Sequence, residues 1–201
     1  MEDFNGIQDV FVHVLDTGTT SRISVDSSGA EASTGVNGIG PNSVTDDGRL
    51  VAFLSTSTSL VADDTNGVAD CFLRDRMTGT TTRVSVGATQ GNAASNSLPR
   101  ISGNGRFVAF HSAATNLVAG DTNGFVDVFV RDLVTLATAR LTLNGATQAD
   151  GDSLDPCLSG TGAPAVFESP AYPLFPWGCP RWVRTQSRPT AAPSISRRPS
   201  H

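Results

Sequence analysis

The stretch PRISGNGRFVAFHSAATNLVAGDTNGFVDVFVRDLVTLATARLTL, residues 99–143, decides the fold of this chain. It holds four short runs rich in β-branched and aromatic residues, separated by polar turns, which is the pattern of four consecutive strands. Residues 41–86 repeat it 57 positions earlier, with GRLVAF matching GRFVAF and DTNG matching DTNG. Such a fixed period is typical of a repeat architecture, in which each unit buries its apolar faces against its neighbours.

Partial units flank the two complete ones. Residues 3–25 carry the third and fourth strands of the pattern, and residues 155–169 carry the first and second. We therefore expect an all-β, partial β-propeller of four-stranded antiparallel blades, with full blades at 41–86 and 99–143 and half blades at 3–25 and 155–169. A solenoid stack of sheets is the alternative. Because a ring needs about four to eight blades, the repeats predict a fragment of a longer propeller, an open arc, or a chain completed by partners.

The strand at residues 49–54 is nearly all apolar, without alternation. Such a run predicts a strand that is covered on both faces. The sequence also predicts a first strand at 42–44 and a fourth strand at 81–86, and it places Leu136 where the other copies have the turn glycines Gly18 and Gly79.

The motifs DGRLVAF at residues 47–53, GRFVAF at 105–110 and DVFVRD at 127–132 resemble the TolB-like, WD-type propeller repeat. Two departures are Asn104, where the repeat has Asp, and Ala163-Pro164, where it has Arg and an apolar residue. The resemblance covers residues 3–169 and implies a propeller fold. It also implies a non-catalytic scaffold that binds a protein or another ligand, with a parent protein in the periplasm or outside the cell. Some members of the family form the propeller of larger enzymes, so a hydrolase with its catalytic domain elsewhere is the alternative.

The charge is divided between two regions. Residues 1–169 hold all 19 acidic residues and nine Arg, whereas residues 170–201 hold five Arg, no acid and seven of the eleven Pro. The acidic body argues against a nucleic-acid partner, and no apolar run is long enough to span a membrane. No signal peptide is visible at the N-terminus, so the sequence leaves the compartment open. The repeat stops abruptly at residue 170. The tail at 170–201 is interpreted as a disordered Pro/Arg-rich extension, as a basic or polyproline II ligand tail, or as the product of a frameshift.

The best candidate for chemistry is the loop D-x-N-G-x-x-D, which occurs three times. Its members are Asp64, Asn66 and Asp70; Asp121, Asn123 and Asp127; and Asp3, Asn5 and Asp9. Ca²⁺ prefers several carboxylate and amide oxygens, and calcium loops of integrin-type propellers look similar, so a weak calcium site is one hypothesis. Ala62 and Ala119 stand where such loops have their first ligand. The alternative is a purely structural loop, because Asn-Gly is a strong turn former and Asp can bind backbone N–H groups.

The remaining polar residues predict no catalytic group. Arg22, Arg83 and Arg140 recur at the start of the fourth strand, and we expect them to pair with nearby acids such as Asp75 and Asp132. His13 and His111 do not recur, Cys71 replaces a core Val of the other copies, and no G-x-S-x-G elbow occurs.

Overall fold

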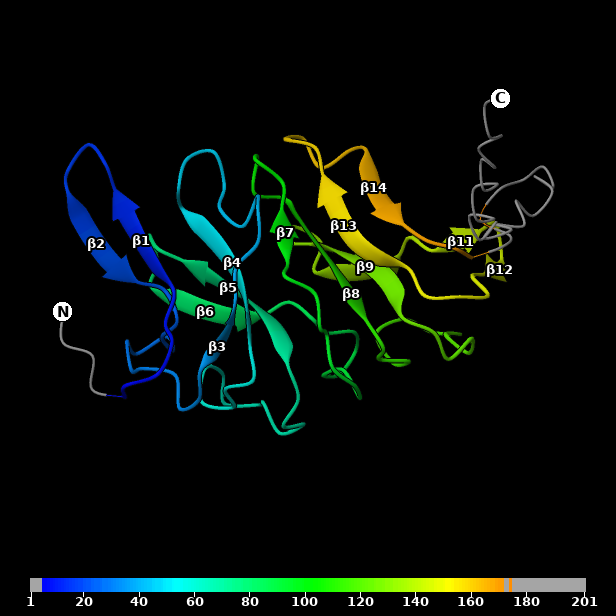
Figure 1. Cartoon of the computed structure of the whole chain (residues 1–201), viewed down its shortest axis with the longest axis horizontal. Helices are drawn as coiled ribbons and strands as arrows, with labels where there is room; N and C mark the ends of the chain where they lie inside the picture. Colours follow the sequence, from blue (N-terminus) through cyan, green and yellow to red (C-terminus); the bar gives the residue numbers. More distant parts are fainter. Residues whose placement is uncertain (1–4, 172–173, 175–201) are drawn as a thin grey trace, which may run out of the picture.

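The computed structural model describes residues 5–171 and residue 174. This part of the chain folds into strands joined by turns, and none of it forms a helix that could cross a membrane. Figure 1 shows the sheets side by side along the chain. The strands are β1 (Phe11–Val14), β2 (Thr19–Arg22), β3 (Val36–Gly38), β4 (Leu50–Ser55), β5 (Asp70–Asp75), β6 (Thr80–Arg83), β7 (Arg100–Ile101), β8 (Phe107–Ser112), β9 (Asp127–Asp132), β10 (Ala137–Arg140), β11 (Leu143–Asn144), β12 (Thr147–Gln148), β13 (Leu154–Leu158) and β14 (Ala165–Glu168).

Two four-stranded sheets have the same topology. The first sheet has the order β3-β4-β5-β6 and the second has β7-β8-β9-β10, with every neighbouring pair antiparallel. Gly48 and Gly105 allow the tight turn before β4 and β8, since both have a positive φ (68° and 72°) that other residues adopt only with strain. The all-β prediction is therefore confirmed, while the number of blades stays a prediction.

Strand β4 is covered on both faces, as its unbroken apolar sequence predicted. Val51 and Phe53 pack toward the N-terminal hairpin β1–β2, in a cluster that contains Val10 and Ile23. On the other face, Ala52 and Leu54 pack toward the second sheet, in a cluster with Ile101, Val108 and Phe110. Burial on both sides removes the alternation that a one-sided strand would need.

A pair of phenylalanines crosses the middle of each four-stranded sheet. Phe53 stacks on Phe72 with a centroid distance of 5.7 Å, and Phe110 stacks on Phe129 at 5.9 Å. All four rings are fully buried. Each pair occupies directly opposite positions in the register, so strand pairing and ring packing specify the same alignment.

Two hairpins occupy the ends of the row of sheets. The N-terminal hairpin β1–β2 packs on the first sheet, and the C-terminal hairpin β13–β14 packs on the second sheet, with β13 lying against β8 (Figure 1). By their place in the repeat, β1 and β2 are the third and fourth strands of a unit, and β13 and β14 are the first and second. The two hairpins therefore correspond to different strand pairs of the sequence repeat, and their assignment as half blades stays a prediction.

The edge of the first sheet differs from the prediction. Strand β3 lies before residue 41, and the predicted strand at 42–44 is reduced to a bridge between Val44 and Val51. Asn42 has a φ of 56°, which interrupts the extended chain between these two segments. The hairpin β11–β12 was not predicted.

Cys71 is buried, which confirms its interpretation as a core residue. The tail predicted from residue 170 onward lies outside the described residues, apart from residues 170, 171 and 174, and all interpretations of it stay predictions.

Candidate functional site

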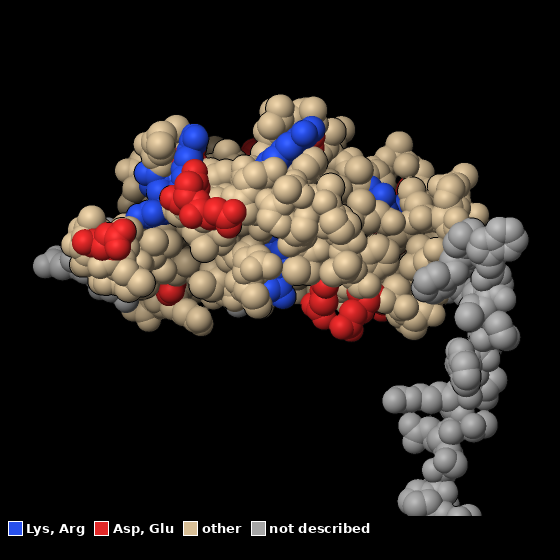
Figure 2. Space-filling model, turned by 90° about the horizontal axis from the view of Figure 1, so that it is seen from above, with Lys and Arg blue, Asp and Glu red and all other residues tan. Residues whose placement is uncertain are grey.

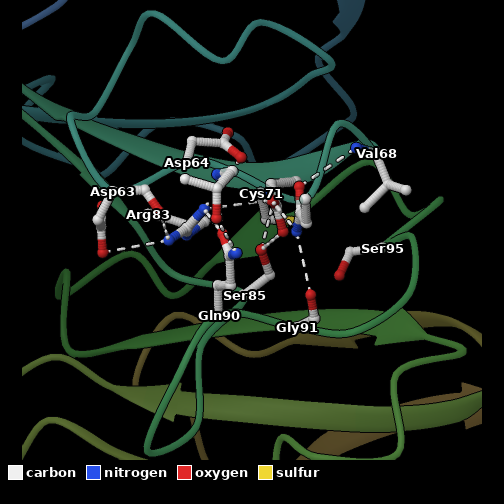
Figure 3. A network of polar contacts seen from close by, with 12 residues as sticks. Asp63, Asp64, Val68, Cys71, Arg83, Ser85, Gln90, Gly91 and Ser95 are labelled. Carbon is white, nitrogen blue, oxygen red and sulfur yellow. Dashed lines mark hydrogen bonds and ion pairs between the residues drawn. The ribbon is translucent and has the colours of Figure 1, made fainter.

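The loop between β4 and β5 brings its predicted polar residues together (Figure 3). Asn66 Nδ2 donates to Asp70 Oδ2 at 2.9 Å and to the carbonyl oxygen of Gly91 at 3.0 Å. Asn66 Oδ1 accepts from the backbone N–H of Val68 at 3.2 Å, which closes the turn. Asn66 therefore fastens the loop both to the start of β5 and to the segment that leads to the second sheet.

Arg83, at the end of β6, supplies the positive charge of this network. Its Nη1 lies 3.2 Å from Asp64 Oδ1 and 3.6 Å from Asp70 Oδ2, and its Nη2 lies 3.2 Å from Asp63 Oδ2. The side chains of Arg83, Asp64 and Asp70 are at most 2% exposed. Ser85 Oγ adds a hydrogen bond of 2.6 Å to the other oxygen of Asp70. The two loop carboxylates thus share one guanidinium inside the protein.

Gln90 joins the network from the connection after β6. Its Oε1 accepts from Arg83 Nη1 at 3.0 Å and from the backbone N–H of Thr65 at 3.1 Å. The side-chain amide of Gln90 therefore links Arg83 to the acidic loop.

The second loop, between β8 and β9, repeats the arrangement. Arg140 Nη1 lies 2.7 Å from Asp121 Oδ1 and 3.1 Å from Asp127 Oδ2, and it donates to Gln148 Oε1 at 2.9 Å. Asn123 Nδ2 donates to Asp127 Oδ2 at 2.9 Å and to the carbonyl oxygen of Ala149 at 3.1 Å. The hydroxyl of Thr142 donates to Asp127, as Ser85 does to Asp70.

The N-terminal copy keeps the same plan with one exchange. Asp9 Oδ2 lies 3.3 Å from Arg22 Nε, and Ser24 Oγ donates to Asp9 Oδ1 at 2.5 Å. Asn5 Nδ2 donates to the carbonyl oxygen of Ala32 at 3.2 Å, and Glu31, paired with Arg22, takes the place of the glutamine. Asp3, the remaining predicted residue of this copy, lies outside the described residues.

Burial sets the electrostatics of the two complete networks. Loss of water raises the pKa of Asp64, and the charge of Asp70 raises it further, while Arg83 acts in the opposite direction. Loss of water also raises the pKa of Asp121, with Arg140 opposing it and Asp127 adding to it. Among residues 5–171 and residue 174, no group of three or more His, Cys, Asp or Glu is arranged to hold a metal ion. In the first network, the buried charge of Arg83 instead links the acidic loop, the start of β5 and the connection after β6.

The predicted partners of the arginines were wrong. Asp75 pairs with Arg49 at 2.6 Å and Asp132 pairs with Arg106 at 2.9 Å, both near the surface. The antiparallel register explains this, because it places Arg83 opposite Phe72, whereas Asp75 lies opposite Thr80 at the far end of the hairpin. A register drawn from the turn at Gly79 could have excluded Asp75 as the partner of Arg83.

A second site, which sequence reasoning missed, lies between the first and second sheets at the edge of the hairpin turns. It is a groove of about 480 Å³ with apolar residues from both sheets. These are Leu50, Leu73, Leu133, Val134 and Leu136. The pair formed by Arg49 and Asp75 also lines it. The sequence signal that could have indicated this groove is Leu136, an apolar residue that replaces the turn glycine of the other copies.

The two histidines among the described residues are placed as ordinary structural residues. His13 Nδ1 lies 2.7 Å from Thr20 Oγ1, across the N-terminal hairpin. His111 Nδ1 accepts the backbone N–H of Asp155 at 3.2 Å, and burial lowers the pKa of His111.

No protein-family model matches the chain, and no curated protein matches it. Among solved structures, it is similar to TolB from Acinetobacter baumannii, with 19% identity and a TM-score of 0.48, over 79% of this chain and 31% of that one. It is also similar to a putative TolB from Agrobacterium tumefaciens, with 18% identity and a TM-score of 0.49, over 82% of this chain and 46% of that one. These structures belong to the family that the repeat motifs resemble, and the chain spans less than half the length of either.

Proposed function

We propose that the chain is a non-catalytic β-propeller scaffold that binds a protein through the groove between its first and second sheets. In this proposal each four-stranded sheet is a blade, and the two terminal hairpins are half blades. The partner is a protein segment that inserts an apolar side chain between Leu73 and Leu136 and places a polar group near Arg49 and Asp75, since those residues line the groove.

The recurrence of the acidic loops supports a structural role for them. The same acids, arginine, hydroxyl and amide occupy equivalent places around Arg83 and Arg140. A catalytic group must be free to exchange a proton or a bond with a substrate. These buried carboxylates are instead held by partners from the chain in each copy, which suits a device that stabilises every blade.

The conformation of Leu136 is the observation that carries the binding site. Leu136 has a φ of 56°, where the equivalent Gly18 and Gly79 have 65° and 70°. An L-residue in this region costs roughly 1–2 kcal/mol. Leu136 is also 64% exposed, and the neighbouring Val134 is 72% exposed. A strained and exposed apolar residue on the rim of a groove is better explained by a contact with a partner than by folding.

The distribution of charge on the face that Figure 2 shows agrees with such a partner. Figure 2 shows one face of the molecule, on which acidic and basic side chains form small separate groups and most of the surface carries neither. A protein segment held by apolar contacts suits this surface better than a polyanion would.

Replacing Leu136 with glycine is expected to raise the free energy of unfolding by about 0.5–1 kcal/mol, because the strain is relieved while the unfolded chain gains some freedom. Urea denaturation followed by circular dichroism measures this. Leu136→Ala keeps the strain and is the control for loss of the side chain alone. A Leu136→Gly variant less stable than Leu136→Ala would show that the turn is not strained.

Selection of phage-displayed random peptides on the 201-residue chain tests the binding site. We expect enriched peptides with an apolar anchor whose affinity falls at least about tenfold in Leu136→Gly and in Val134→Ser, corresponding to the loss of about 1.4 kcal/mol. Met77→Ser is the matched control, because Met77 occupies the same turn of the first sheet, is exposed, and does not line the groove. Peptides that bind all three variants as they bind the original chain would refute the assignment.

Calcium binding at the acidic loops is the second candidate. The charge balance favours it, because two buried carboxylates face one guanidinium at Arg83 and again at Arg140. Asp64, Asn66 and Asp70 would then supply oxygen ligands, as would Asp121, Asn123 and Asp127, with Asn5 and Asp9 in the N-terminal copy. A Tm that rises at millimolar calcium, and does not rise in Asp64→Asn, would support the site. A Tm unchanged by calcium would exclude it.

Two hypotheses that follow from the family resemblance stay predictions. The first is that these sheets form the propeller of a larger hydrolase whose catalytic domain lies elsewhere. The second is that the parent protein is located in the periplasm or outside the cell.

A further inference from the structure

The two ends of the row of sheets expose residues that the interior copies of the repeat bury. Phe11 of β1 is 47% exposed, whereas its equivalents Phe72 and Phe129 are 0% exposed. Val44 is 46% exposed, whereas its equivalent Ile101 is 1% exposed. Each repeat contacts only its neighbours, so equivalent residues differ in this way where no unit among the described residues covers them.

The C-terminal hairpin shows the same difference. Val166 of β14 is 63% exposed, whereas Ala52 and Ala109 at the equivalent position are buried. The sheet order also leaves the outer edge of β14 without a strand among the described residues. In the two complete sheets, that edge pairs with the third strand of the unit.

The N-terminal hairpin leaves the matching space open. A cleft of about 560 Å³ lies between β1 and the edge of the first sheet, and Phe11, Val12, Val44 and Val51 line it. At the equivalent place between the first and second sheets, Ala52 and Leu54 of β4 fill the space and pack with Ile101. Strand β14 is the counterpart of β4 in the repeat, so a β13–β14 hairpin could fill this cleft as β4 fills the equivalent space.

We propose that two copies of this chain associate reciprocally, with the β13–β14 hairpin of each copy completing the β1–β2 hairpin of the other. Each pairing forms one composite four-stranded blade. The inference rests on the proposed blade architecture and is independent of the groove, which lies between the sheets of a single copy.

The register of the composite blade follows from the complete sheets. Ala109 lies opposite Val130, and Phe110 lies opposite Phe129. The repeat then places Val166 opposite Val12 of the second copy and Phe167 opposite Phe11 of the second copy. The second pair continues the phenylalanine stacking of the two complete sheets, and it covers the ring of Phe11.

The number of blades selects two copies. Each copy contributes two four-stranded sheets and two halves, which amount to three blades. Propellers close with about four to eight blades, so two copies, giving about six, fit a ring, whereas one copy and three copies do not. Reciprocal pairing leaves neither hairpin edge open, which closes the assembly.

The mass of the 201-residue chain in solution tests the proposal. Sedimentation equilibrium is expected to give twice the chain mass of 20.9 kDa. Phe11→Asp and Val166→Asp are each expected to shift the mass to one copy, because both residues are exposed in a single copy and covered in the composite blade. Met77→Asp is the control, since Met77 is exposed in the turn between β5 and β6 of a complete sheet, and it should leave the mass doubled. A monomeric original chain, or a dimer that survives both end substitutions, would overturn the proposal.

Disulfide trapping tests the register and does not depend on the two aspartate variants folding well. In a background with Cys157→Ser and Cys179→Ser, Val12→Cys and Val166→Cys together should form an intermolecular disulfide, because directly opposite Cα atoms about 4.5–5.5 Å apart satisfy its geometry. His13→Cys with Val166→Cys is the control, because alternation puts residue 13 on the other face of β1. Equal cross-linking in both pairs, or none in either, would contradict the composite blade. Peptide binding to the groove is measured separately from the mass. A monomer that binds groove peptides would contradict the dimer and leave the proposed function intact, whereas a dimer that binds none would contradict the proposed function and leave the dimer intact.

Discussion

Replacing Arg83 with alanine is expected to lower the free energy of unfolding by about 3–5 kcal/mol, since it removes one partner from a buried ion network. Asp64 and Asp70 would then lie side by side inside the protein without the guanidinium that both contact. Gln90 Oε1 would lose one of its two donors and keep the bond from the backbone N–H of Thr65. Because small domains are stable by only about 5–15 kcal/mol, this change is large enough to leave a substantial unfolded fraction. Urea denaturation at neutral pH measures it.

The pH dependence of this loss identifies its cause. Burial already raises the pKa of Asp64, and Arg83 counteracts that rise. Without Arg83 the folded state binds protons more readily than the unfolded state does, so lowering the pH from 7 toward 5 stabilises the variant relative to the original protein. We therefore expect the difference in stability to be greatest at pH 7 and smaller at pH 5. A difference that does not change over this range would point to lost packing instead of unpaired charge.

Arg106→Ala is the matched control, because it removes an arginine from an ion pair at the surface instead of from a buried network. Arg106 pairs with Asp132 at 2.9 Å, but the arginine side chain is 50% exposed. Hydrogen bonds from Arg106, Val134 and Thr135 lower the pKa of Asp132 to about 2. Water screens this pair, so its removal is expected to cost only about 0.2–1 kcal/mol. Equal losses in Arg83→Ala and Arg106→Ala would show that burial of the network has no energetic consequence.

Replacing Phe129 with alanine is expected to cost about 3–5 kcal/mol, the range for a large aromatic residue in a packed core. Phe129 is fully buried, stacks on Phe110, and belongs to the cluster between the first and second sheets. The backbone of a central strand cannot move inward to fill the space, because both strands beside β9 hold it in register. Chemical denaturation with equal m-values for the two proteins would give this difference directly.

Phe125→Ala provides the comparison within the same region. Phe125 lies in the loop before β9 and is partly exposed, so its loss is expected to be well below that of Phe129→Ala. Phe129→Leu retains most of the apolar volume and should be intermediate. If Phe129→Ala and Phe125→Ala were equally stable, the stacked pairs would not form the centre of the sheets.

Much of the architecture could be predicted because the copies of the repeat can be aligned with one another, so that a strand or turn indicated in one copy is supported by the others. Strands β4 and β8 carry apolar residues at successive positions, which only a strand covered on both faces tolerates. The Asn-Gly turn brought Asp64, Asn66 and Asp70 together because all three lie in the loop before β5 or at the first residue of that strand. Local sequence was sufficient for these features, since each depends on residues close along the chain.

The sequence by itself thus determined the repeating strands, their turns and the grouping of the acidic loops. Only the tertiary structure decided that Arg83 and Arg140 pair with the acids of those loops. It also decided that Leu136 lines a groove between two sheets, and that Phe11 is exposed where Phe72 is buried. The physical reason is that pairing and burial depend on register and on neighbouring sheets. Phe11 and Phe72 are equivalent positions of the repeat, 61 residues apart, and they have the same sequence context but quite different surroundings.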